Sequence, residues 1–97
     1  MATVNFQNLV CNNSLGAVTL HFQVPPNPIY SAGSMTPGVH VNIGVSRSFT
    51  GTKQVTLSVN TSGGTINRAH NIPATPTPLS LTFSFPGATY TLACNVS

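Results

Sequence analysis

The final stretch of the chain, residues 79–96, restricts the fold most, because apolar and polar residues alternate strictly along it. The apolar members of this pattern are Leu79, Leu81, Phe83 and Phe85 in its first half and Tyr90, Leu92, Cys94 and Val96 in its second. Pro86-Gly87 interrupts the two halves. Successive side chains of a strand point to opposite faces, so this pattern predicts an antiparallel hairpin with one buried face.

The same alternation recurs through the rest of the chain. It predicts further strands over 4–10, 18–24, 39–45 and 55–60, and a short one over 65–67. Residues 29–38 are predicted to be loop, and the proline-rich segment 73–78 an extended edge. No window shows helical periodicity. The prediction is an all-β fold, with residues 1–97 forming a single antiparallel β-sandwich of seven to eight short strands, either jelly roll or immunoglobulin-like.

The first fourteen residues break the alternation. The apolar residues of this segment are Val4, Phe6, Leu9 and Val10, and their phase slips after Phe6. Such a slip indicates a strand with a bulge, or an extended segment that docks elsewhere. Residues 1–14 are therefore predicted to be either an edge strand or an N-terminal arm that these four side chains dock onto another copy.

Charge is the compositional outlier. The chain of 97 residues has no Asp or Glu, and its cations are Arg47, Lys53 and Arg68, which give a net charge of +3. Natural sheets protect their edges with lysine, inward-pointing charges or proline, and here only Lys53 and segment 73–78 are identified as such protection. Weak charge repulsion and few protected edges together predict a homo-oligomer or polymer.

The same composition excludes several function classes. Without a carboxylate to orient a histidine, general acid–base and triad chemistry lack a partner, so no enzymatic activity is expected. His21 and His40 are predicted to lie on polar strand faces. Even as neighbours on one sheet they would lack a second-shell carboxylate for a metal, so solvent-facing histidines are the favoured interpretation. No cofactor or metal is expected. Three scattered cations make no nucleic-acid surface, and no apolar run approaches the roughly 20 residues of a membrane span.

Cys11 and Cys94 lie near opposite ends of the sequence. A disulfide between them is the favoured prediction. Within one chain it would close a long loop and contribute about 4 kcal/mol in the chain-entropy model, whereas between chains it would join neighbouring copies. Two buried free thiols are the alternative.

The position of the two cysteines carries a family resemblance. Asn8-Leu9-Val10-Cys11-Asn12-Asn13 near the start and Tyr90-Thr91-Leu92-Ala93-Cys94-Asn95 in the final strand resemble the layout of endospore-appendage fibre subunits. Those subunits are jelly rolls whose N-terminal connectors cross-link to neighbours. The resemblance implies a non-enzymatic structural subunit that self-assembles into an extracellular fibre or a similar assembly at a cell or virion surface. Separately, residues 86–92 resemble the turn and strand near the end of fibronectin type III domains.

A second function remains open from the residues alone. A small binding module, such as a lectin, an adhesin or a virion-decorating domain, would take a glycan as its partner. Tyr30, Phe49 and Tyr90 are the aromatic residues that would form the platform for a sugar, with Asn and Ser supplying hydrogen bonds.

Overall fold

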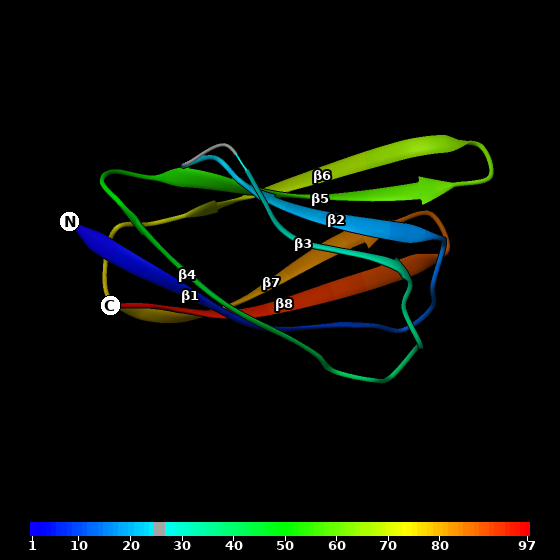
Figure 1. Ribbon diagram of the computed structural model, residues 1–97, viewed down its shortest axis with the longest axis horizontal. Coiled ribbons are helices and arrows are strands. Elements are labelled where there is room, and N and C mark those ends of the chain that lie inside the picture. Colours follow the sequence, from blue (N-terminus) through cyan, green and yellow to red (C-terminus); the bar gives the residue numbers. More distant parts are fainter. Residues whose placement is uncertain (25–26) are drawn as a thin grey trace.

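The computed structural model describes residues 1–24 and 27–97, which form eight β-strands (Figure 1). The strands are β1 (Ala2–Cys11), β2 (Ala17–Phe22), β3 (Asn27–Ser34), β4 (Val41–Phe49), β5 (Lys53–Thr61), β6 (Gly64–Ile72), β7 (Thr77–Phe85) and β8 (Ala88–Val96). No helix occurs in the part of the chain that the structure describes, so none is available there to cross a membrane. The all-β prediction is confirmed.

The strands form two antiparallel sheets packed face to face. Sheet A has the order β4-β1-β8-β7 and sheet B the order β3-β2-β5-β6 (Figure 1). The two chain ends lie side by side in sheet A, where Thr3 and Ser97 exchange backbone hydrogen bonds of 2.9 and 2.8 Å. The predicted β-sandwich is confirmed.

Strand order distinguishes this sandwich from a jelly roll. A jelly roll nests its strands so that the second pairs with the seventh and the third with the sixth. Among the strands described here, β2 lies in sheet B and β7 in sheet A, and β2 and β5 separate β3 from β6. Strand β5 instead returns beside β2 after the β2–β3–β4 succession, which is a Greek-key connection.

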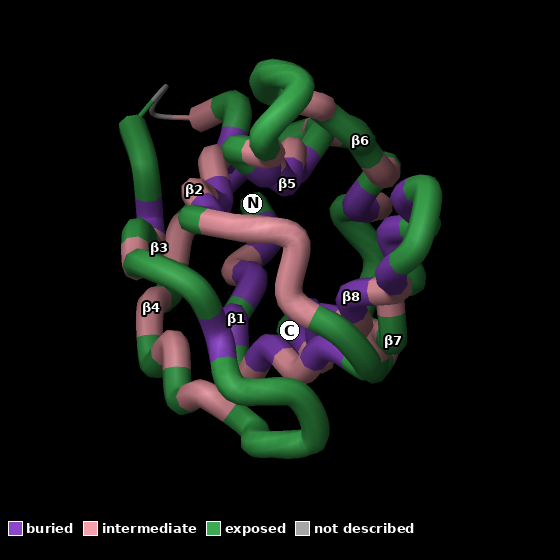
Figure 2. Tube along the Cα trace, turned by 90° about the vertical axis from the view of Figure 1, so that its right-hand side faces the viewer, coloured by how far each residue is buried: buried purple, intermediate pink, exposed green. Residues whose placement is uncertain are grey.

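The core lies between the sheets and is apolar (Figure 2). Its largest fully buried side chains include Tyr90, Phe6, Phe22 and Phe83. Phe22 of sheet B makes edge-to-face contacts with two rings of sheet A, at centroid distances of 5.3 Å to Phe6 and 5.6 Å to Phe49. Such pairs stabilise a core by about 0.5–1.5 kcal/mol beyond their buried area. These three rings therefore join the two sheets.

The structure corrects the prediction for the first fourteen residues. β1 is neither an arm nor an edge strand, because β4 pairs with one side of it and β8 with the other. Val4, Phe6 and Leu9 are fully buried in the core and Val10 is half-buried, so these side chains face their own domain and not a neighbour. The alternative of a bulged strand is confirmed, since the register of β1 shifts between Phe6 and Asn8 on both sides.

One strand was missed in the sequence and another was predicted too short. β3 occupies a stretch predicted to be loop, and its alternation is obscured by register shifts on either side of Val18–Leu20. β6 includes the short strand predicted over 65–67 but extends to Ile72. Both are edge strands in which most residues are exposed, which leaves little periodic signal. Pro25 and Pro26, which are expected to end the strand predicted over 18–24, lie outside the described residues.

The bulge makes a prediction about Leu9. Because the extra residue at Gln7 moves the inward face from even to odd positions, Leu9 is buried while Asn8 points outward. Leu9→Ala is expected to lower the free energy of unfolding by about 2–5 kcal/mol. Asn8→Ala is the matched control and should cost less than about 1 kcal/mol. Urea unfolding measures both, and equal costs at the two positions would contradict the bulged register.

Candidate functional site

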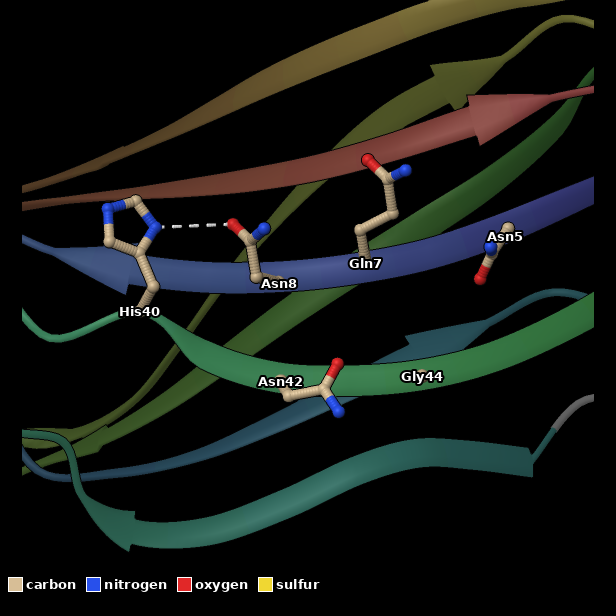
Figure 3. A pocket seen from close by; sticks show the side chains of 6 residues that line it. All are labelled: Asn5, Gln7, Asn8, His40, Asn42 and Gly44. Atoms are coloured by element: carbon tan, nitrogen blue, oxygen red, sulfur yellow. Dashed lines mark hydrogen bonds between the residues drawn. The ribbon is translucent and has the colours of Figure 1, made fainter.

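The bulge in β1 creates an amide-rich surface on the outer face of sheet A. Because β1 carries one residue more than β8 at this point, Asn5, Gln7 and Asn8 all face away from the core. Figure 3 shows their amide groups along β1, above the neighbouring strand β4. An uninterrupted strand would have turned Asn8 inward. The bulge therefore gathers three primary amides on one face.

Strand β4 provides the other side of this surface. Asn42 and Gly44 are exposed on β4, and His40 precedes the strand (Figure 3). Gly44 has a φ of 63°, a left-handed conformation that favours glycine at a bulge. The Asn42 amide lies 3.6 Å from the point that a β-carbon on Gly44 would occupy. The absence of a side chain at Gly44 therefore leaves space beside this amide.

Together these six residues line a shallow hollow of about 530 Å³, called the amide hollow below. One hydrogen bond connects its members, 3.3 Å long, from His40 Nδ1 to Asn8 Oδ1 (Figure 3). Primary amides present both donors and acceptors without charge. The chemistry available in the amide hollow is therefore hydrogen bonding to a neutral polar ligand.

A second cluster joins the edges of the two sheets where β6 faces β7. Arg68 Nε donates a 3.0 Å hydrogen bond to the backbone carbonyl of Ser84, and His70 Nε2 donates to the carbonyl of Thr82. The Arg68 guanidinium also lies 5.4 Å from the centre of the Phe85 ring. His70 packs edge-on against Phe83 at 4.8 Å. We refer to Arg68 and His70 as the clasp.

The clasp occupies hydrogen-bonding groups that an edge strand otherwise offers to another chain. Thr82 and Ser84 belong to β7, the edge strand of sheet A, and their carbonyls point away from β8 toward β6. These two carbonyls are therefore already paired within the chain. The sequence carried a signal for the clasp: Arg68 and His70 alternate with Ile66 and Ile72 on one face of a strand.

The structure corrects the predicted disulfide. Cys11 and Cys94 lie on the adjacent strands β1 and β8, but Cys94 is opposite Phe6 and Cys11 is opposite Tyr90. That offset places them about 14 Å apart along the strands, whereas a disulfide requires α-carbons within about 7 Å. Both thiols are free and buried, so neither is accessible to a second chain, and the alternative of two buried thiols is the one observed.

The histidines and aromatic residues considered as candidate sites are also not brought together. His21 is on β2 of sheet B, while His40 leads into β4 of sheet A. Phe49 and Tyr90 are core residues, and the Tyr90 hydroxyl accepts a 3.2 Å hydrogen bond from the Leu15 amide. Tyr30 alone is partly exposed. Across the residues described, no three His or Cys side chains gather in a manner that would hold a metal ion.

Comparison with known proteins identified no relative: no family model, no curated protein and no solved structure matches the chain.

The buried thiol of Cys94 predicts a pH dependence of stability. Burial raises the pKa of Cys94 from 9.0 to about 11, because the thiolate would lose its hydration. The folded state therefore favours the protonated thiol more than the unfolded state does. That contribution is complete below pH 9 and is lost as the pH rises from about 9 to about 11.

Urea unfolding at a series of pH values tests this under reducing conditions. The free energy of unfolding is expected to fall more steeply between pH 9 and 11 in the parent protein than in Cys94→Ala. The comparison uses the slope against pH, since the substitution also removes buried volume. Identical slopes in the two proteins would show that Cys94 is not the titrating group.

Proposed function

We propose that the chain is a non-enzymatic structural subunit whose copies associate through the edges of their β-sheets, in an extracellular fibre or a similar surface assembly. The observation that carries the proposal is the regular edge of β6. This strand pairs with β5 over nine consecutive residue pairs without a register shift, and no other strand of the described residues pairs with its opposite edge.

The absence of carboxylates supports the same proposal. With three cations and no acid in 97 residues, the outer surface is built from hydroxyl and amide side chains. Two copies that approach each other meet little electrostatic repulsion, which is the usual guard against association. The contact passes through a sheet edge and not through an N-terminal arm or a disulfide, because β1 is held on both sides and both thiols are buried.

Sedimentation and multi-angle light scattering over a wide range of protein concentration test the proposal. The average mass is expected to rise with concentration and to change little between low and moderate salt, because ion pairs make no contribution. Reducing agent should leave the association unchanged. A single species of monomer mass at millimolar protein concentration would overturn the proposal.

A small binding module is the second candidate, favoured by the amide hollow. Its lining residues present several uncharged donors and acceptors in one concave surface, which suits the hydroxyl groups of a glycan. A glycan array tests this candidate, with Asn42→Ala expected to reduce any signal at least tenfold. Asn71→Ala, an exposed amide on β6, is the matched control. An array without a hit, or one insensitive to Asn42→Ala, would eliminate the hollow as a glycan site.

A further inference from the structure

The four edge strands differ in how far they are open to pairing. β3 contains Pro28 and two register shifts. β4 contains the register shift near Gly44. β7 contains Pro78, and the clasp occupies two of its carbonyls. Proline and bulges each oppose edge pairing, and β6 has neither, so β6 is the regular edge within the described residues.

The hairpin that joins β5 to β6 shows which groups of β6 are free. Thr61 pairs with Gly64 around a two-residue turn, and the pair that flanks such a turn is hydrogen-bonded. Hydrogen-bonded pairs alternate along an antiparallel ladder, so Ile66, Arg68, His70 and Ile72 bond to β5. The intervening residues direct their N–H and C=O groups away from β5, and these are Thr65, Asn67, Ala69 and Asn71.

The side chains of β6 are compatible with a second strand at this edge. Thr65, Asn67, Ala69 and Asn71 are all uncharged and exposed. Arg68 and His70 lie on the other face of this strand, where they contact β7. In Figure 1 the half of β6 near the turn from β5 lies along the upper rim of the molecule.

We propose that β6 is the contact surface for a second copy of this chain, which adds its own β6 antiparallel with Asn67 at the two-fold axis. Sheet B then continues from one copy into the other as β3-β2-β5-β6-β6-β5-β2-β3. This inference rests on the proposed function, and it specifies which edge carries the association. The contact is self-complementary and closes as a dimer, which would be the unit of any larger assembly.

The charge of Arg68 restricts the register. With Asn67 at the axis, Arg68 of one copy lies opposite the apolar Ile66 of the other, and Thr65 lies opposite Ala69. An axis at Arg68 would place two guanidinium groups opposite each other. Like charges directly opposite each other destabilise a strand pair, and an axis at Asn67 avoids this.

Cysteine cross-linking tests the register in the full chain. In Asn67→Cys the introduced thiols of two copies meet at the axis, about 5.5 Å apart between α-carbons, which suits a disulfide. Asn71→Cys is the matched control on the same strand and face, and its two copies would lie about 27 Å apart. The native cysteines are buried, so the parent protein measures the cross-linking that occurs without an introduced cysteine. Mild oxidation followed by non-reducing intact mass measurement detects the covalent dimer.

The expected result is a covalent dimer for Asn67→Cys and at least tenfold less for Asn71→Cys. Ala69→Pro removes an outward-facing N–H and should weaken association at least tenfold, while Ala69→Thr should not; circular dichroism verifies that both variants fold. If the parent associates but Asn67→Cys does not cross-link, the β6 register is overturned and the proposed function stands. If the parent stays monomeric, both fall.

Discussion

The architecture depends on the two-sided pairing of β1. As an inner strand of sheet A, β1 joins β4 on one side to β8 on the other, and so connects the start, the middle and the end of the sequence in one ladder. This strand also contains Phe6, which packs edge-on against Phe22 of the opposite sheet. Removal of β1 would leave β4 without a partner in its sheet. An N-terminal segment held in this way is part of the core and not a free connector.

The bulge in the same strand relates the core to the outer surface. One extra residue at Gln7 lets the inward face change from Val4 and Phe6 to Leu9 and Cys11 without a break in pairing. The cost is a run of outward-facing amides, which forms one wall of the amide hollow. A bulge re-aims side chains in this manner wherever a strand needs to change its phase. The hollow and the buried position of Cys11 therefore have the same cause.

A chain with only three charged side chains still uses two of them at its sheet edges. Arg47 lies on edge strand β4 and Arg68 on edge strand β6, where Arg68 and His70 occupy carbonyl groups of β7. The sequence-based view that Lys53 and segment 73–78 were the edge protection was incomplete, since Lys53 begins the inner strand β5. Protection is therefore uneven around the sandwich, and β6 is the edge whose ladder contains neither proline nor a register shift.

The strands that alternate most clearly in sequence were predictable because one face of each is buried and the other is more exposed. The terminal hairpin and the phase slip after Phe6 are of this kind, and both are present as expected. The edge strand β3 escaped prediction and β6 was predicted only in part, because most of their residues are exposed and carry little periodic signal. The alternation of Arg68 and His70 with Ile66 and Ile72 is visible in the sequence, but the groups that they contact are not. Those contacts, like the positions of the two cysteines, depend on strand order and register, since Arg68 of sheet B reaches Ser84 of sheet A.

Amide hydrogen exchange, followed residue by residue at two protein concentrations, tests most directly whether copies of this chain associate through β6. The outward-facing amides of Thr65, Asn67, Ala69 and Asn71 should exchange more slowly at high concentration, because the second copy supplies their hydrogen-bond acceptors. Exchange at Ser80, Thr82 and Ser84 of the clasped strand β7 should be independent of concentration. Equal rates at both concentrations for the β6 amides, or new protection confined to β3 or β4, would contradict this account.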